Sequence, residues 1–194
     1  MRVFVAINPP REVRARIGEA ERDLREAGFP IRWVPAENVH LTLKFLGEVA
    51  EKQLRDVYEA VDGAVSGIDV FEMAVGGFGA FPSLRRPSVV WLGVELDSVL
   101  SSLQARTEEN LSLLGFPRED RPFRPHLTLG RSRKRAEMSE FRGLETIVSR
   151  LEYSDSFRVG TVDVMSSRLM PTGAVYDVIH RAELGDKIVS EQGA

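Results

Sequence analysis

The tetrapeptide HLTL occurs twice in this chain, beginning at His40 and again at His126. The chain has only three histidines in 194 residues. Shuffling its composition gives two His-x-Thr pairs with a probability of roughly 0.003, so the repeat calls for an explanation. In a β-strand, successive side chains point to opposite faces. We therefore expect His40 and Thr42 to share one face, and His126 and Thr128 to share one, with the leucines packed under helices behind them.

Two such faces would form a two-histidine acid–base site. Displacement at a phosphodiester needs a base on the attacking oxygen and an acid on the leaving oxygen, on opposite sides of phosphorus. Imidazole titrates near pH 6.5 and can fill either role, and threonine hydroxyls can donate to the non-bridging oxygens. A lone histidine on a strand is more often structural, but the matched pair favours catalysis by His40, Thr42, His126 and Thr128. His180 has no threonine two residues on, and we interpret it as structural or exposed.

A metal centre is the weaker interpretation of the same residues. Two histidines without a third nearby, and without acidic residues at ligand spacing, do not match a zinc or iron site. The chain has no cysteine, which excludes disulfides, thiolate zinc ligands and a thiol nucleophile. We predict that the site uses no metal and no cofactor.

The composition is that of a soluble globular protein, with 43% hydrophobic residues, 28% charged residues and a net charge of −3. The charged residues are unevenly distributed along the sequence, however. Residues 118–135 hold six arginines and one lysine against one glutamate and one aspartate. Such a run suits a phosphate or a short nucleic acid, although a solvated loop is the alternative. The sequence has no apolar run long enough to span a bilayer and begins with a strand-like segment, so we expect a cytoplasmic protein that does not enter a membrane. A self-contained bilobal fold makes a monomer the simplest expectation.

Short strand patterns alternate with helix patterns along the chain, which indicates an α+β fold with at least two sheets or lobes, one HLTL in each. The predicted strands are residues 3–8, 31–34, 39–46, 70–75, 89–94, the second HLTL, 157–169 and 174–184. The predicted helices are residues 9–27, 51–65, 98–114 and, more weakly, 134–150.

The segments RVFVAINPP, RWVPAENVHLTLKFLG, RRPSVVWLGVE and FRPHLTLGR occur in the order seen in a known family. The chain resembles the 2H phosphoesterases, and within them the RNA 2′,3′-cyclic phosphodiesterases, historically called 2′-5′ RNA ligases. The resemblance implies a single domain over residues 1–194 made of two intertwined lobes. It also implies two antiparallel sheets with outer helices, related by a pseudo-twofold axis around a central cleft that carries both motifs.

The resemblance further implies metal-independent hydrolysis of RNA 2′,3′-cyclic phosphate ends to 2′-phosphates, and reversible 2′-5′ ligation as a second activity. RNA ends or nucleotides bearing that cyclic phosphate would be the partners. The catalytic roles carry over to the four motif residues.

Four further residues are candidates for substrate binding. Phe45 and Arg131 each lie five positions after a motif histidine, and their flat side chains could flank the terminal base. Arg131 could instead bind phosphate, and Phe45 could instead pack in the core behind the sheet. Strict alternation would place both on the leucine face, so this role requires a bulge or a strand end. Phe4 could line the cleft, and Arg133 could bind the RNA chain.

Two alternatives remain open from the sequence. One is a phosphodiesterase for 2′-5′-linked oligonucleotides or for another nucleotide cyclic phosphate. The other is a non-catalytic RNA-binding relative, which would fail to hydrolyse a 2′,3′-cyclic nucleotide. For the hydrolase, the Arg-rich surroundings of His126 favour a neutral ring there, and hence a base, whereas His40 is expected to stay protonated as the acid.

Overall fold

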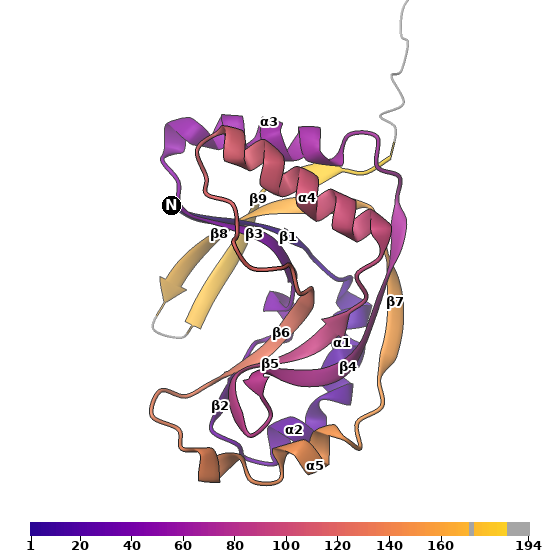
Figure 1. Ribbon diagram of the computed structural model, residues 1–194, viewed down its shortest axis with the longest axis vertical. Coiled ribbons are helices and arrows are strands. Elements are labelled where there is room, and N and C mark those ends of the chain that lie inside the picture. The colour runs from indigo at the N-terminus through magenta and orange to yellow at the C-terminus, as the bar shows by residue number, and fades with distance from the viewer. Residues whose placement is uncertain (171–172, 186–194) are drawn as a thin grey trace, which may run out of the picture.

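The computed structural model describes residues 1–170 and 173–185, which form one antiparallel β-sheet with helices packed against it (Figure 1). The strands are β1 Arg2–Ile7, β2 Ile31–Trp33, β3 Leu41–Glu48, β4 Phe71–Ser83, β5 Arg86–Val94, β6 His126–Ser132, β7 Ser154–Val159, β8 Thr161–Met170 and β9 Gly173–Glu183. The α-helices are α1 Arg11–Ala20, α2 Arg22–Glu26, α3 Leu54–Val65, α4 Ser98–Leu113 and α5 Leu144–Val148, and the 3-10 turns are η1 Ala36–Asn38, η2 Glu51–Gln53 and η3 Met138–Phe141.

The two motif strands, β3 and β6, are neighbours in the middle of the sheet. The strand order is β7-β4-β5-β6-β3-β1-β8-β9, with β2 paired to β6 off this path. β3 and β6 pair only at Leu41 and Leu127. The sequence predicted two sheets, one for each motif. The structure instead joins both motifs in one sheet whose two halves meet at this single pair.

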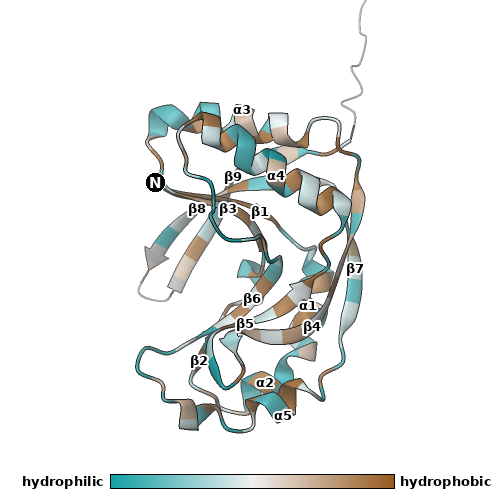
Figure 2. Cartoon of the chain, in the orientation of Figure 1, coloured by the Kyte–Doolittle hydropathy of each residue, from teal (hydrophilic) through white to brown (hydrophobic). Residues whose placement is uncertain are grey.

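The leucines of both motifs lie in the main hydrophobic core, as the alternation predicted. All four are at most 3% exposed, and they share a cluster with apolar residues of α1, α3 and α4. Figure 2 shows hydrophobic and hydrophilic positions mixed along α3 and α4, as expected for helices with one face on the core. Burial of each leucine side chain contributes about 1.5–3 kcal/mol, so the motif strands are held firmly from behind.

Three segments differ from the sequence-based expectation. β4 continues to Ser83 instead of ending at residue 75, and it forms a long hairpin with β5. The predicted strand over residues 157–169 is divided at Gly160. The part before Gly160 pairs with β4 in one half of the sheet, and the part after it pairs with β1 in the other. The predicted helix over residues 134–150 is reduced to η3 and α5.

β3 contains a bulge at the second leucine of its motif. β1 pairs Val5 with Lys44 but Ala6 with Thr42, so Leu43 is an extra residue on β3. The partner of Phe4 is then Phe45. Because Phe4 and Ala6 share one face of β1, Phe45 returns to the face that carries Thr42. The bulge that a binding role for Phe45 requires is therefore present.

β6 has a bulge at the same place in its own motif. β5 pairs Val90 with Gly130 but Trp91 with Thr128, which leaves Leu129 as the extra residue, and Val89 pairs with Arg131. Arg131 therefore lies on the Thr128 face. Gly130 turns to the opposite side, where a Cβ would lie 2.5 Å from Cγ2 of Ile31. Only glycine fits at that position without displacing β2.

The bulge in β3 turns Lys44 toward the core, where it forms a buried ion pair. Lys44 is 2% exposed, and its Nζ donates to Glu108 Oε2 on α4 at 2.7 Å and to the Pro117 carbonyl at 2.7 Å. The backbone N–H of Glu119 also donates to Glu108 Oε2, at 3.4 Å. The pair thus ties the bulge to the segment that leads from α4 to the second motif.

Removing one member of this pair should destabilise the protein by about 3–5 kcal/mol, because the remaining charge stays buried without a partner. We expect this loss for Lys44→Met and for Glu108→Leu, measured by urea unfolding. The double variant should be more stable than either single variant, since it leaves no unpaired charge. Arg55→Met, which breaks the exposed Arg55–Glu59 pair on α3, is the control and should change stability little. Additive losses in the double variant would contradict a coupled pair.

Candidate active site

His40 is held in one orientation by a backbone carbonyl. Its Nδ1 lies 2.7 Å from the carbonyl oxygen of Asn38, the last residue of η1. A carbonyl oxygen can only accept, so Nδ1 carries the proton and Nε2 is left free to act as a base. The ring of Phe4 lies 4.9 Å from the imidazole, and the ring of Tyr176 meets it edge-on at 5.3 Å. His40 is therefore both oriented and enclosed by aromatic surface.

His126 is held in the same way. Its Nδ1 lies 2.7 Å from the carbonyl oxygen of Arg124, again two residues before the histidine. Phe81 on β4 meets the ring edge-on at 5.1 Å. Both motif histidines are therefore oriented through Nδ1, and this contact leaves Nε2 free.

The pairing of β3 with β6 brings the two motifs together. The one pair that joins these strands lies at the first leucine of each HLTL. In antiparallel register, His40 then lies across from Thr128, and Thr42 lies across from His126. All four side chains lie on the side opposite the buried leucines. The histidine and threonine of each motif therefore flank the leucine at which the two strands pair.

The electrostatic setting of His40 favours its neutral form. Its pKa is lowered to about 4, chiefly by burial; the hydrogen bond to the Asn38 carbonyl opposes this, and the charges of Arg14, Arg131 and His126 add to it. The expectation that His40 stays protonated for want of nearby cations is therefore wrong. That expectation counted only neighbours in sequence, whereas Arg14 comes from α1 and Arg131 from the other motif.

The four candidates for substrate binding occupy different positions. Phe45 is 62% exposed beside the motif residues of β3, and Arg131 is exposed on the same face of β6. Phe4 is only 3% exposed and packs beneath the rings of His40 and Phe45, so it supports the site from below. Arg133 is exposed just beyond the end of β6.

Three residues next to the motif histidines were not found by sequence reasoning. Tyr176 and Phe81 enclose the two imidazoles, and Arg14 acts on the charge of His40. Each comes from a segment far from its histidine in the sequence. Of the three, only Arg14 could have been suspected from the sequence, because it lies off the apolar face of the helix that directly follows β1.

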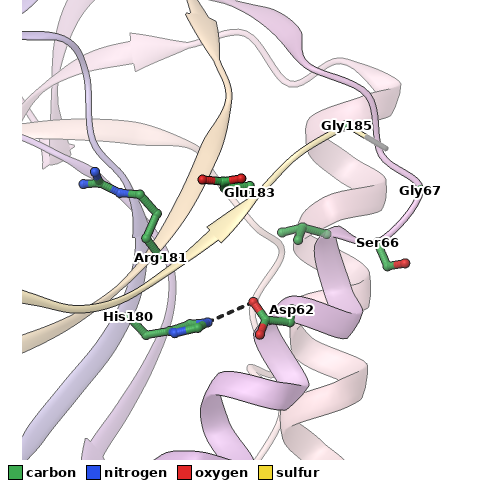
Figure 3. Close-up of a pocket in the computed structure, with 8 residues that line it drawn as sticks. Asp62, Ser66, Gly67, His180, Arg181, Glu183 and Gly185 are labelled. Carbon is green, nitrogen blue, oxygen red and sulfur yellow. Dashed lines mark hydrogen bonds and ion pairs between the residues drawn. The ribbon is translucent and has the colours of Figure 1, made fainter. Parts of the chain in front are cut away.

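His180, the third histidine, lies apart from the motifs. Its Nε2 is 2.8 Å from Oδ1 of Asp62 (Figure 3). Its ring stacks on Tyr58, with 4.6 Å between the ring centroids. These contacts join β9 to α3 beside a cavity of about 390 Å³ that Arg181 and Glu183 also line. His180 therefore fastens a strand to a helix, in agreement with its interpretation as structural.

Residues 1–170 and 173–185 contain neither a metal-ligand cluster nor a membrane-spanning helix. Within these ranges, no three His, Cys, Asp or Glu side chains gather as metal ligands would. No helix in the same ranges is long and apolar enough to cross a bilayer.

The lowered pKa of His40 should be visible by NMR. We expect the ring to remain the neutral Nδ1–H tautomer from pH 7 down to about pH 4. The unfolded chain takes up this proton near pH 6.5 and the folded protein only near pH 4, so the free energy of unfolding should fall as the pH falls between these values. His40→Gln should remove this part of the pH dependence. Titration of His40 near pH 6.5 in the folded protein would contradict a buried, neutral ring.

The fold matches solved structures over almost its whole length. A structure from Thermus thermophilus aligns with a TM-score of 0.76 and 31% identity, covering 95% of this chain and 98% of that one. The Escherichia coli protein LigT in complex with 3′-AMP aligns with a TM-score of 0.73 and 26% identity, with coverage of 95% and 98%.

Relatives with assigned names agree with these structures. An RNA 2′,3′-cyclic phosphodiesterase of Thermotoga maritima is 36% identical over 190 residues, covering 94% of this chain and 95% of the relative. A protein of the same name from Methanothermobacter thermautotrophicus is 35% identical over 179 residues, with coverage of 91% and 95%. The family model for LigT-like phosphoesterases matches residues 7–91 and 94–176. Together with the paired motifs, these matches show that the chain belongs to the LigT-like phosphoesterase family of 2H enzymes.

Proposed function

We propose that this protein opens the 2′,3′-cyclic phosphate at an RNA end by metal-independent acid–base catalysis and leaves a 2′-phosphate. One observation carries the proposal. Two histidines on adjoining strands each donate Nδ1–H to a backbone carbonyl at 2.7 Å, so both have Nε2 available on the motif face. A one-step displacement at phosphorus needs two such groups. The names of the relatives supply the substrate class.

The two histidines take different roles in this proposal. His40 is neutral in the free protein, so its Nε2 accepts a proton from the attacking water. Water oxygen bonds to phosphorus, the bond from phosphorus to O3′ breaks, and His126 donates the proton that O3′ needs. The product carries a free 3′-hydroxyl and a 2′-phosphate. His40 then releases its proton to solvent and His126 regains one, which restores both rings.

The remaining motif-face residues bind the substrate. Thr42 and Thr128 donate to the non-bridging phosphate oxygens, whose charge must be stabilised as the bond changes. Phe45 and Arg131 lie on the same face as the threonines because of the bulges. Their exposed planes can flank the terminal base. Arg133 adds charge for the RNA that precedes the terminus.

The same site can support ligation. If the 5′-hydroxyl of a second RNA attacks in place of water, the same loss of O3′ leaves a 2′-5′ linkage. We also infer a pseudo-twofold relation between the two halves of the sheet. Three features support this relation. The strands on either side of the β3–β6 pair follow a matching order. Both motif strands have a bulge, and both motif histidines bond to a backbone carbonyl.

The test uses a short RNA that ends in a 2′,3′-cyclic phosphate. We expect conversion to the 2′-phosphate, identified by chromatography against both phosphate isomers, and undiminished turnover in excess EDTA. His40→Ala and His126→Ala should each lower turnover by about 10² or more, the scale for removing a positioned acid or base. His180→Ala is the matched control and should change turnover little. Loss of activity in EDTA with recovery on adding Mg²⁺ would overturn the metal-free mechanism.

A substrate with sulfur in place of O3′ separates the two roles. A thiolate leaves without needing a proton, so the acid becomes dispensable while the base does not. We expect the thio-substrate to rescue His126→Ala and to leave His40→Ala inactive, measured as single-turnover rates at pH 7. Rescue of His40→Ala alone would restore the assignment that the sequence favoured.

A further inference from the structure

Arg14 occupies a half-buried position between α1, the end of β1 and the turn η1. Its Nη1 donates to the carbonyl of Glu37 at 2.8 Å, and its Nη2 donates to Oδ1 of Asn8 at 3.0 Å. Its Nε is buried and has no hydrogen-bond partner among the residues that the structure describes. A cation with a buried, unpaired donor is costly, so the position calls for a functional reason.

The carbonyl bound by Arg14 belongs to the turn that orients His40. Glu37 and Asn38 are consecutive residues of η1, and the Asn38 carbonyl is the acceptor for His40 Nδ1. On its other side, the Asn38 side chain donates to the carbonyl of Ala174 in β9 at 3.0 Å. The turn is thus fixed from α1 by Arg14 and from β9 by its own asparagine.

A polar chain behind Arg14 keeps its guanidinium in place. Asn8, which accepts from Arg14, donates its Nδ2 to Oδ2 of Asp163 at 2.7 Å. Asp163 is 1% exposed and also accepts from Arg181 Nε at 2.8 Å. Asp163 is therefore shared between Arg181 and the Asn8 contact of Arg14, and the carboxylates of Asp163 and Glu37 both act on the charge of Arg14.

We propose that Arg14 is a positioning residue, which holds η1 so that the Asn38 carbonyl fixes the His40 ring with Nε2 directed to the substrate. This proposal rests on the proposed function of His40. The charge of Arg14 also disfavours the imidazolium. The other ionisable groups that face His40 are Arg131 and His126 from β6 and Tyr176 from β9. Arg14 is the one contributed by α1.

The test compares three variants in the full-length protein. Arg14→Met removes both the charge and the hydrogen-bond donors. Arg14→Lys keeps the charge, but its single nitrogen cannot reproduce the two hydrogen bonds to Glu37 and Asn8. Arg16→Met is the matched control, because Arg16 lies on the same helix and pairs with Asp155 at the surface. Urea unfolding establishes that each variant is folded. The readouts are the pKa and tautomer of His40 by NMR, and the pH profile of kcat/KM on a 2′,3′-cyclic mononucleotide.

In Arg14→Met, loss of the Arg14 charge should raise the pKa of His40 above its value in the parent protein but leave it below 6.5, because burial is the larger cause of the low value. The acid limb of kcat/KM should move to higher pH with it. The value of kcat at neutral pH should fall between roughly 10-fold and 10²-fold, the scale for a misplaced catalytic group. KM should change little, because Arg14 does not touch the substrate. Arg14→Lys should keep the pKa of His40 low and recover part of kcat, and Arg16→Met should match the parent protein in every readout.

An unchanged pKa and tautomer of His40 in Arg14→Met would overturn the proposal, whatever the activity. An equal shift in Arg16→Met would overturn it too, since that would show a general effect of α1. If Arg14→Met is unfolded, Arg14→Lys is compared with the parent protein instead. A lower kcat in Arg14→Lys then supports the proposal, and an unchanged kcat overturns it. The NMR readout needs no turnover, so a shifted pKa in a protein that does not cleave cyclic phosphates would uphold the positioning role and refute the proposed function.

Discussion

The site depends on one extra residue in each motif strand. Regular alternation would place the His and Thr of a motif on one face and the residue five positions after the His on the other. The bulges at Leu43 and Leu129 cancel one step of this alternation, so Phe45 and Arg131 return to the motif face. A bulge bends and twists its strand locally. The motif histidines and threonines can therefore share one surface with Phe45 and Arg131 although they belong to the same short strands.

The two bulges have different consequences on the core side. In β3 the displaced residue is Lys44, whose Nζ donates to Glu108 and to the Pro117 carbonyl. In β6 it is Gly130, which leaves room for β2. The histidines differ in a comparable way. His40 is enclosed by Phe4 and Tyr176 with Arg14 nearby, while the ring contact of His126 is with Phe81. Two similar motifs therefore place their imidazoles in different surroundings, and at His40 burial lowers the pKa of the ring.

Features set by local geometry could be predicted from the sequence, whereas features set by distant contacts could not. Alternation correctly placed the motif leucines in the core and identified the need for a bulge near Phe45. It could not show that the Leu41–Leu127 pair would join the two halves of the sheet. Nor could it show that the chain would pass from one half of the sheet to the other at Gly160. The protonation of His40 was predicted in the wrong direction because burial and Arg14, which both favour the neutral ring, are tertiary features. Phe4 was a candidate for lining the cleft, but alternation alone could not show that the rings of His40 and Phe45 would bury it.

The division of the chain at Gly160 also fixes the order in which the site can be completed during synthesis. The half of the sheet with His126 consists of β2 and the stretch from β4 to β7. The half with His40 combines β1 and β3 with β8 and β9, which are made last. Pairing of β1 with β8 closes most of the polypeptide into one loop, a slow and non-local step. On the ribosome, the surroundings of His126 can therefore assemble before Tyr176 of β9 is available to His40. A chain shortened before that residue would carry both histidines, but His40 would lack the Tyr176 ring beside it.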